Sequence, residues 1–264
     1  MLELKNIYKT FNPGTINEKV ALNGLNLTLN EGDFVTVIGG NGAGKSTMLN
    51  AVAGTWQVDE GQIIIDGIDV TKLSEHKRAA YLGRVFQDPM TGTAATMGIE
   101  ENLALAKRRG KTRLLKPGIT KKEREEYKEL LKVLGLGLED RLTSKVGLLS
   151  GGQRQALTLL MATVVTPKIL LLDEHTAALD PATAEKVLNL TKRIVAENKI
   201  TCLMITHNMQ SALDLGNRTL MMNSGEIVLD VKEEERKGLT VADLLEKFKE
   251  GVGAQLDNDR ILLS

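Results

Sequence analysis

The sequence predicts an α/β fold with a mainly parallel sheet, an antiparallel β part at the N-terminus and an inserted α-helical lobe. Three observations carry this prediction. The first thirty residues alternate apolar and polar positions, as antiparallel strands with one solvated face do. Later apolar runs alternate with helical patterns, which is typical of parallel strands joined by right-handed crossovers. Between about residues 88 and 145, helix signal predominates.

The N-terminal half predicts the following elements in order. LELKNIYKTF and VALNGLNLTLN predict two antiparallel strands, and the β-branched run FVTVIGG predicts a buried one. A helix is expected from Lys45 to about Ala53, and a short strand in GQIIIDG. Within the lobe, KKEREEYKELLKVLGLG predicts a helix that stops at a glycine.

The C-terminal half predicts three buried strands, in KILLLDE, ITCLMIT and RTLMMN. A helix over about residues 182–198 joins the first two, and TVADLLEKFKEGVG predicts one amphipathic helix near the end. Strands alternating with helices in this way favour a parallel sheet.

Composition narrows the classes of function. The chain has 264 residues, 42% of them apolar, and a formal net charge of zero, so we expect no nucleic-acid partner. Cys202 is the only cysteine, which excludes an internal disulfide and suggests a reducing compartment. No apolar run is long enough to span a membrane, and the N-terminus has no signal-peptide pattern. The basic run over residues 107–122 indicates either a solvated loop or a contact with anionic lipid or an acidic partner.

The stretch GGNGAGKS, residues 39–46, fits the phosphate-loop pattern G-x-x-x-x-G-K-[ST] between a buried strand and a helix. Its glycines let the backbone curl so that successive N–H groups point at a phosphate. Lys45 then supplies positive charge to the β- and γ-phosphates, and the Ser46 hydroxyl is a magnesium ligand. This motif predicts binding of a nucleoside triphosphate.

Polar side chains at the ends of predicted strands are the candidates for catalysis. Asp173 and Glu174 close an apolar strand, and because side chains alternate along a strand they cannot share one role. Asp173 suits the surroundings of the magnesium ion, and Glu174 suits a general base for the attacking water. His207 follows the next strand and is expected to contact the γ-phosphate and the water. Gln87 ends an earlier strand and is expected to bind magnesium or the water.

A second candidate anion site lies in LSGGQRQALTL, residues 149–159. Leu157, Leu160, Met161 and Val164 recur at helical spacing behind Ser150, which is a good N-cap. Two glycines weaken a helix entry unless the backbone must come close to another group. The bare N-terminus of this helix therefore predicts a second contact with phosphate.

These motifs, in this order, resemble those of the ATP-binding cassette (ABC) family over residues 2–231. The resemblance identifies residues 39–47 as Walker A, Gln87 as the Q-loop, 149–153 as the signature motif, 177–180 as the D-loop and His207 as the switch histidine. It implies a phosphate-loop (RecA-like) core, with Asp173 and Glu174 closing Walker B. The implied cofactors are ATP and Mg²⁺.

The resemblance implies the following site residues. Catalysis is assigned to Glu174, His207 and Gln87, and magnesium binding to Ser46, Gln87 and Asp173. Nucleotide binding is assigned to Phe11, Gly39, Asn41, Gly42, Ala43, Gly44, Lys45, Ser46, Thr47, Ser150, Gly151, Gly152, Gln153 and Asp180. Phe11 is the expected adenine-stacking ring, with Tyr8 as the alternative. Gly40 and the continuation QALTLLMAT depart from the usual family pattern.

The resemblance also implies partners and a division of the chain. Residues 1–87 and 166–235 are expected to form the nucleotide-binding core, 88–165 the helical lobe and 236–264 a C-terminal helix and tail. Two copies are expected to pair head to tail, so that each ATP lies between Walker A of one copy and the signature of the other. Membrane permease subunits, an extracytoplasmic solute-binding protein and a peripheral position at the cytoplasmic face of the membrane are implied.

The resemblance is nearest to a subgroup described as ATPase components of tryptophan/tyrosine or related amino-acid importers, which implies import of a small solute. One alternative is a soluble, non-transport ABC ATPase of the iron–sulfur assembly type. A small-molecule kinase shares only the phosphate loop and does not explain LSGGQ.

Overall fold

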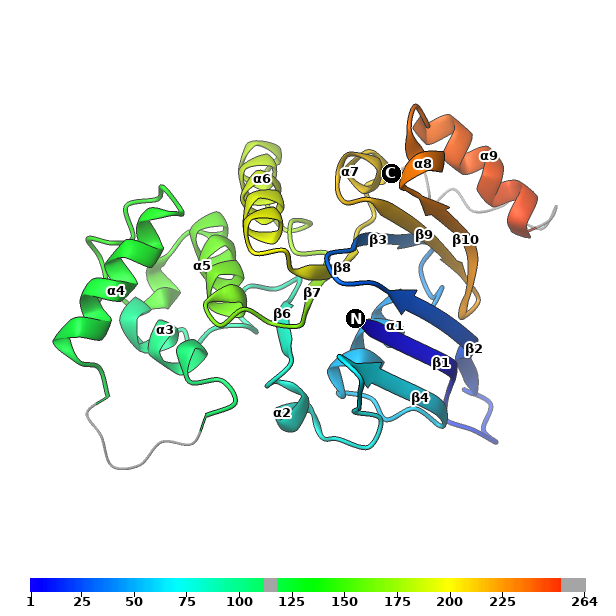
Figure 1. The fold of residues 1–264 in the computed structure, drawn as a ribbon, viewed down its shortest axis with the longest axis horizontal. Coiled ribbons are helices and arrows are strands. Elements are labelled where there is room, and N and C mark those ends of the chain that lie inside the picture. Colours follow the sequence, from blue (N-terminus) through cyan, green and yellow to red (C-terminus); the bar gives the residue numbers. More distant parts are fainter. Residues whose placement is uncertain (112–117, 253–264) are drawn as a thin grey trace. The chain divides into compact units, whose positions relative to one another are not determined.

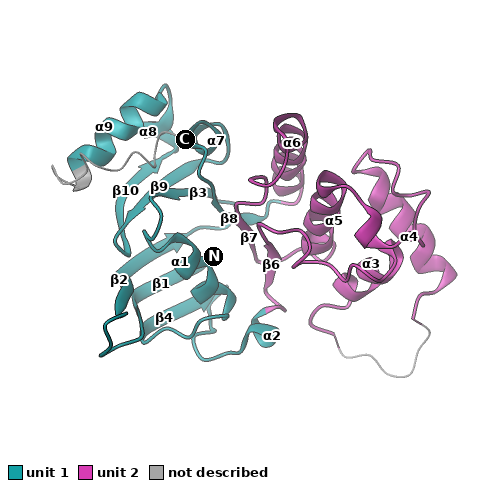
Figure 2. Cartoon of the chain, turned by 180° about the vertical axis from the view of Figure 1, so that it is seen from behind, with its two compact units in different colours: residues 1–78, 199–264 teal, residues 79–198 magenta. Residues whose placement is uncertain are grey.

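The two ends of the chain fold together into one unit, and the middle of the chain forms a second. In this computed structural model, which describes residues 1–111 and 118–252, unit 1 comprises residues 1–78 and 199–264 and unit 2 residues 79–198 (Figures 1 and 2). The strand that carries Asp173 and the helix after it belong to unit 2. The functional division that we predicted has other boundaries and stays a prediction.

Unit 1 begins with an antiparallel sheet in the order β2-β1-β4-β5. Its strands are β1 (Leu2–Phe11), β2 (Lys19–Leu29), β4 (Glu60–Ile65) and β5 (Ile68–Asp69). β1 lies between β2 and β4 and is antiparallel to both. Leu2 and Leu4 on β1 are buried and Lys5 is exposed, as expected for strands with one solvated face. The predicted antiparallel N-terminal part is confirmed.

A second set of strands in unit 1 has a parallel centre. β3 (Phe34–Gly39) pairs in parallel with β8 (Thr201–Ile205) on one side and β9 (Arg218–Asn223) on the other. Every residue of β3 and β8 is buried, which explains why both read as continuous apolar runs. β10 (Glu226–Lys232) is antiparallel to β9 and was not expected from the sequence.

Helices of different length complete unit 1. They are α1 (Lys45–Ala53), α2 (Glu75–Arg78), α7 (Met209–Asp214), α8 (Glu233–Arg236) and α9 (Val241–Val252). The predicted C-terminal amphipathic helix is α9, whose Leu244 and Phe248 are buried in a cluster with Ile38 and Met221. This cluster fixes α9 beside β9 and β10 (Figure 1).

Unit 2 combines a pair of parallel strands with a helical lobe. β6 (Leu82–Val85) and β7 (Ile169–Asp173) pair in parallel. The helices are α3 (Ile99–Lys107), α4 (Lys121–Lys132), the short 3₁₀ helix η1 (Val146–Leu148), α5 (Gly151–Thr163) and α6 (Pro181–Glu197). The apolar faces of α3, α4 and α5 meet in one buried cluster that includes Leu103, Leu131 and Leu157. The predicted helical lobe is therefore held by its own core.

The helix that was predicted to stop at a glycine ends just before one. α4 ends at Lys132, before Gly135, the first glycine after it. Leu134 and Leu136 pack against the core cluster of the lobe. Gly135 has φ 65°, in the left-handed region, so the chain leaves the helical path at the first glycine after α4, close to the predicted end.

The basic run over residues 107–122 lies partly outside the described residues, which omit 112–117. At its start, Lys107 contacts Glu126, Arg108 contacts the Gly118 carbonyl oxygen, and Arg109 donates 2.9 Å to the Ala162 carbonyl oxygen. These three side chains are engaged within unit 2. Contact of this run with lipid or with an acidic partner stays a prediction.

Candidate active site

The loop between β3 and α1 in unit 1 depends on glycine. β3 ends at Gly39 and α1 begins at Lys45, so the loop lies where a buried strand meets a helix N-terminus. Gly39 has φ 150°, and a Cβ there would lie 2.3 Å from the Met222 carbonyl oxygen. Gly44 has φ 101°, and a Cβ there would lie 2.5 Å from the Ala21 carbonyl oxygen. Only glycine fits both positions without moving the backbone.

The Lys45 side chain is folded back over this loop. It is only 5% exposed, and its ammonium group donates to the carbonyl oxygens of Gly39 at 2.7 Å and Gly40 at 3.0 Å. Gly44 caps α1 without a side chain, and no acidic residue lies in the first turn. The positive end of this helix and the lysine therefore converge on one place, as anion binding requires.

The remaining predicted loop residues differ in exposure. Asn41 and Gly42 are exposed, Ala43 is buried and Thr47 is half-buried. The exposed positions leave the outer turn of the loop open to a ligand, while Ala43 anchors it through a hydrogen bond from the Gly225 N–H to its carbonyl oxygen.

The predicted magnesium ligands all supply oxygen atoms, the type that this ion prefers. Ser46 places an exposed hydroxyl in the first turn of α1 in unit 1. In unit 2, the Asp173 carboxylate lies at the end of β7, and Gln87 is exposed in the turn after β6. Each of these three groups, a hydroxyl, a carboxylate and an amide, offers an oxygen of the kind that Mg²⁺ binds, so the residue types fit the ion.

Phe11 at the end of β1 lies beside a second ring that sequence reasoning missed. Its ring centroid is 5.2 Å from that of Trp56, in an edge-to-face arrangement, and the Lys9 ammonium is 5.7 Å from the Phe11 centroid. Trp56 is the only tryptophan, is 41% exposed and comes shortly after α1. Tyr8, the alternative, has its hydroxyl 2.8 Å from where a Gly24 Cβ would lie. Stacking of adenine on Phe11, with Trp56 as the neighbouring ring, stays a prediction.

His207 follows the end of β8 in unit 1, as the sequence predicted. It is exposed, and the residues on either side of it are fixed. Thr206 is buried, and its hydroxyl accepts from the Asn208 N–H at 3.1 Å. The Asn208 side chain in turn caps α7 by accepting from the Ser211 N–H at 2.8 Å. The histidine is thus carried on a short turn with a defined backbone.

Asp173 and Glu174 differ in backbone conformation. Asp173 is the last residue of β7, and its carboxylate is 3.8 Å from the Arg84 guanidinium. Glu174 has φ 46°, in the left-handed region that non-glycine residues rarely adopt. This turn takes the Glu174 side chain out of the alternation of the strand, so adjacent carboxylates are set up for different roles.

Gln87 is exposed two residues after the end of β6. The neighbouring Phe86 is held from the signature helix, because the Gln155 side-chain amide donates to the Phe86 carbonyl oxygen at 3.2 Å. Gln155 is fully buried on α5. Sequence reasoning missed this link, which connects the segment around Gln87 to the helix that begins at the signature motif.

The signature motif forms a capped helix start in unit 2. Ser150 is the N-cap of α5 and accepts from the Gln153 N–H at 3.3 Å, and the Gln153 side chain accepts from the Ser150 N–H at 3.2 Å. This reciprocal capping box fixes the first turn. It leaves other N–H groups of the turn for an anion.

Glycine is required at position 152 for packing as well as for its predicted function. A Cβ at Gly152 would lie 2.2 Å from the Cγ2 of Thr183 in the first turn of α6, and one at Gly151 would lie 3.4 Å from the Leu179 Cδ2. Asp180 caps α6 by accepting from the Thr183 N–H at 3.1 Å, and hydrogen bonds from Thr183 lower the pKa of the Asp180 carboxyl. The signature and the D-loop are therefore packed against each other within unit 2.

The predicted site residues fall into two groups, each brought together within one unit. Phe11, residues 39–47 and His207 belong to unit 1, and Gln87, residues 149–153, Asp173, Glu174 and Asp180 belong to unit 2. Every predicted residue lies at a strand end, a helix start or the turn between them. Their roles in binding and catalysis stay predictions.

Known proteins resemble the chain in sequence and in fold. The family model described as "ABC transporter" matches residues 22–177. The chain is 46% identical to a tyrosine transport ATP-binding protein of Clostridioides difficile, over 96% of this chain and all of that protein. It is 36% identical to a spermidine/putrescine import ATP-binding protein of Haemophilus ducreyi, over 92% of this chain and 62% of that longer protein.

Solved structures of ATP-binding cassettes also resemble the chain. A dimeric ATP-binding cassette in a post-hydrolysis state, bound to ADP and phosphate, superposes with a TM-score of 0.75 at 32% identity. The match covers 88% of this chain and 99% of that one. The predicted fold, with its antiparallel N-terminal sheet and mainly parallel strands, is thereby confirmed.

Proposed function

We propose that this chain drives the import of an aromatic amino acid of the tyrosine type. The chain belongs to the ABC transporter family and is the ATP-binding, ATP-hydrolysing subunit of such a transporter. The observation that carries the substrate is the 46% identity, over nearly the whole of both chains, with a tyrosine transport ATP-binding protein. The solute itself binds to other subunits, so this chain supplies the energy rather than the selectivity.

ATP binding starts at the phosphate loop of unit 1. The loop N–H groups and the N-terminus of α1 face the phosphates, and the Lys45 ammonium exchanges its bonds to the loop carbonyl oxygens for bonds to phosphate oxygens. Adenine stacks on the Phe11–Trp56 pair, which contributes about 1 kcal/mol. Ser46, Gln87 and Asp173 are the residues that would hold Mg²⁺, and the ion would supply positive charge to the phosphates.

Hydrolysis uses side chains carried by both units. Glu174 accepts a proton from the attacking water, and its left-handed turn separates it from Asp173, which serves the metal. His207 hydrogen-bonds the γ-phosphate and holds the water in line. Gln87 contacts the same region, and its exposed turn is where a change at the γ-phosphate reaches the helical lobe.

The capped start of α5 completes the site of a second copy. Ser150, Gly151 and Gly152 present N–H groups and a positive helix end, equivalent to about half a charge, to the γ-phosphate held by the partner. A similar cassette is known as a dimer with ADP and phosphate. ATP thus joins two copies head to tail, and hydrolysis releases them.

The chain works beside the membrane, bound to permease subunits at the cytoplasmic face. None of the helices in the described ranges has the length and apolar character needed to cross a bilayer. In the proposed function, force from the dimer passes to separate membrane subunits, which receive the solute from an extracytoplasmic binding protein.

The test is transport by the complex that this chain forms. Affinity-tagged chain is purified from detergent-solubilised membranes of its source, and the complex is reconstituted with ATP inside proteoliposomes. We expect copurified membrane subunits and tyrosine uptake that the Glu174→Gln variant abolishes. Uptake of another solute in preference to tyrosine would overturn the substrate, and recovery with soluble partners alone would overturn transport.

A further inference from the structure

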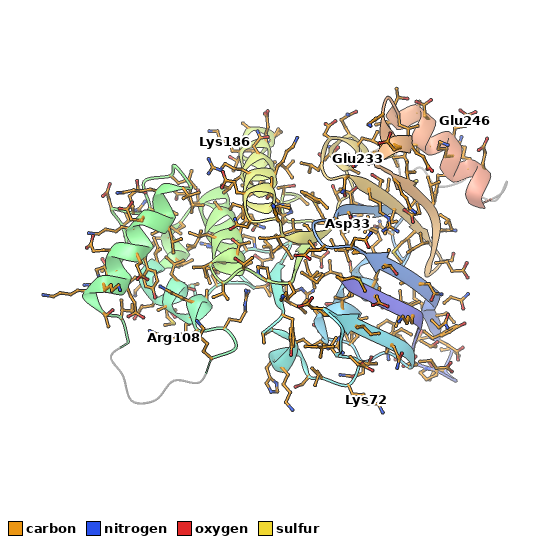
Figure 3. The ribbon with its side chains drawn as sticks, in the orientation of Figure 1. Asp33, Lys72, Arg108, Lys186, Glu233 and Glu246 are labelled. Atoms are coloured by element: carbon orange, nitrogen blue, oxygen red, sulfur yellow. The ribbon has the colours of Figure 1, made fainter. Side chains whose placement is uncertain are left out.

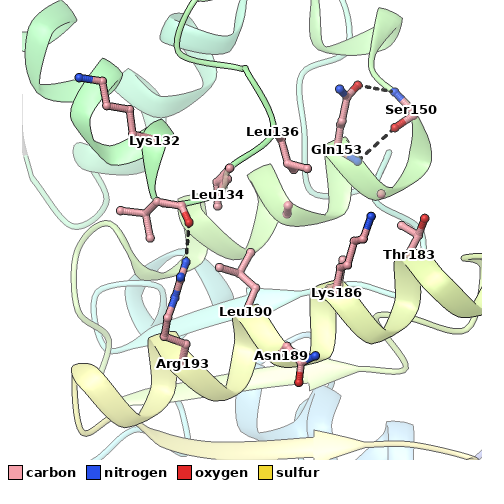
Figure 4. Close-up of a pocket in the computed structure, with 15 residues that line it drawn as sticks. Lys132, Leu134, Leu136, Ser150, Gln153, Thr183, Lys186, Asn189, Leu190 and Arg193 are labelled. Atoms are coloured by element: carbon pink, nitrogen blue, oxygen red, sulfur yellow. Dashed lines mark hydrogen bonds between the residues drawn. The ribbon is translucent and has the colours of Figure 1, made fainter.

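Unit 2 contains a pocket of about 860 Å³ that borders the signature motif and extends from it to residues without a role in the proposed mechanism (Figure 4). It lies between the end of α4, the loop over residues 133–136, the first turns of α5, and α6. A volume of this size is within the range of small-molecule sites. All of its walls belong to one unit.

The residues that line the pocket are apolar, neutral and polar, or positively charged. Apolar side chains from three elements form one part of the lining: Leu134, Leu136, Ala156, Val187 and Leu190. Lys132, Lys186 and Arg193 supply positive charge, and none of the lining residues is an aspartate or glutamate. An apolar surface with positive charge fits an anion that carries an apolar body.

The three cations are not equivalent. Lys132 is bonded to Glu129 at 2.6 Å and extends away from the pocket, and Arg193 is held by the Val133 carbonyl oxygen (Figure 4). Lys186 on α6 is exposed (Figure 3). It reaches towards the first turn of α5, where Ser150 and Gln153 cap the helix (Figure 4). An anion beside Lys186 therefore also meets the positive end of α5.

We propose that this pocket binds a small organic anion with an apolar body. The anionic group pairs with the Lys186 ammonium beside the N-terminus of α5. The apolar body lies against Leu134 and Leu190. The Arg193 side chain, held by the Val133 carbonyl oxygen, also lines this part of the pocket. The ligand class is a carboxylate, sulfonate or phosphate monoester that carries a hydrocarbon or aromatic group.

A ligand in this pocket opposes dimer formation, an effect that rests on the function proposed above. Gly152 and Gln153 line the pocket and also belong to the signature motif. A bound anion places negative charge next to the helix end that receives the γ-phosphate of the partner's ATP. The two anions repel each other, so occupancy of the pocket favours the open state.

Binding is tested with anilinonaphthalene sulfonate and with phenylnaphthylamine, which has the same rings without the sulfonate. Fluorescence titrations use the full chain with ADP and magnesium present to fill the phosphate loop. We expect one site for the sulfonate, about tenfold weaker binding of the neutral probe, and a similar loss in Lys186→Glu, as for a lost charged contact. Lys192→Glu makes the same charge change on an exposed position of α6 outside the pocket and leaves binding unchanged. Equal binding of both probes, or unchanged sulfonate binding in Lys186→Glu, would overturn the proposal.

The effect on pairing is measured separately, on Glu174→Gln protein with ATP and magnesium by size-exclusion chromatography. Saturating sulfonate probe should convert dimer to monomer, and the additional Lys186→Glu change should prevent this conversion. A dimer that persists with the probe bound would overturn the opposition between ligand and pairing. A failure of Glu174→Gln protein to dimerise at all would instead count against the proposed function, because the binding titration needs no dimer.

Discussion

At the scale of single residues, Lys45 is the side chain through which we propose that the loop between β3 and α1 binds phosphate. Its ammonium is buried and bonded to the carbonyl oxygens of Gly39 and Gly40. A buried charge needs such partners, and phosphate oxygens provide stronger ones. In the proposed mechanism, the Lys45 ammonium therefore exchanges carbonyl oxygens for phosphate oxygens when ATP binds.

Replacing Lys45 by methionine keeps most of the side-chain volume and removes the charge. We expect ATP affinity to fall at least a hundredfold, because charge-assisted bonds to phosphate contribute about 1.5–3 kcal/mol each. Isothermal titration with ATP and magnesium measures the change. Affinity within a few-fold of the parent would show that the loop backbone alone holds the phosphates.

His175 is fully buried directly after Glu174, and its protonation state follows from its contacts. The Thr191 hydroxyl donates to the Val187 carbonyl oxygen at 2.8 Å, so it accepts from Nε2–H of His175 at 3.1 Å. Nδ1 is buried without a hydrogen-bond partner. Burial lowers the pKa of His175 from 6.5 to about 4, so the ring is neutral in the folded chain.

This pKa shift predicts acid sensitivity. Between pH 6.5 and about 4 the unfolded chain binds a proton at this position and the folded chain does not, so the free energy of unfolding falls as pH falls. The slope is about 1.4 kcal/mol per pH unit, or about 3 kcal/mol over the window. Above pH 6.5 the contribution is constant. Urea unfolding of the parent and of His175→Gln across this range measures it. The slopes should differ by about this amount, and parallel slopes would contradict the assignment.

At the scale of elements, local signals in the sequence were sufficient to predict where most of the candidate site residues lie on strands and helices. Gly39 to Ser46, Asp173 and Glu174 lie where a strand ends, and Ser150 starts a helix, as expected. Such positions are encoded by neighbouring residues, through apolar runs, glycine spacing and capping. Trp56 beside Phe11 and Gln155 beside Phe86 were missed, because their contacts join segments 45 and 69 residues apart, which periodicity does not report.

Gly152 illustrates the same limit, since its neighbour across the helix pair, Thr183, lies 31 residues away in the chain. A methyl group at Gly152 overlaps the Thr183 Cγ2, so Gly152→Ala should destabilise unit 2 by about 1–3 kcal/mol, as overpacking does. Thr183→Ser removes that methyl group and should restore most of the loss in the double variant. Thermal unfolding of the two single variants and the double variant measures this coupling. Additive losses would show that α5 and α6 are not in contact at this position.

At the scale of the whole molecule, the candidate active residues are divided between two units. In the proposed dimer, each ATP site also takes residues from two copies of the chain. Unit 1 carries the phosphate loop and His207, and unit 2 carries Glu174 and the capped signature helix. The phosphate loop has the N-terminus of only one helix, α1, to contact phosphate. The start of α5 is also a helix N-terminus, but its motif contains no lysine. In the proposed pairing, a second copy fills each gap, which would account for two candidate anion sites in one chain.

This arrangement predicts a dimer that depends on ATP and on the signature. Glu174→Gln removes the base but keeps the shape of the side chain, so ATP should bind, persist and hold two copies together. Size-exclusion chromatography with light scattering should show a dimer with ATP and magnesium and a monomer without them.

Adding Ser150→Arg to this variant puts a bulky side chain at the start of α5. ATP should then bind with nearly unchanged affinity, while the dimer is lost. A monomeric Glu174→Gln protein at saturating ATP would contradict the pairing model. A dimer that survives Ser150→Arg would instead place the contact with the partner's phosphate elsewhere than at the signature.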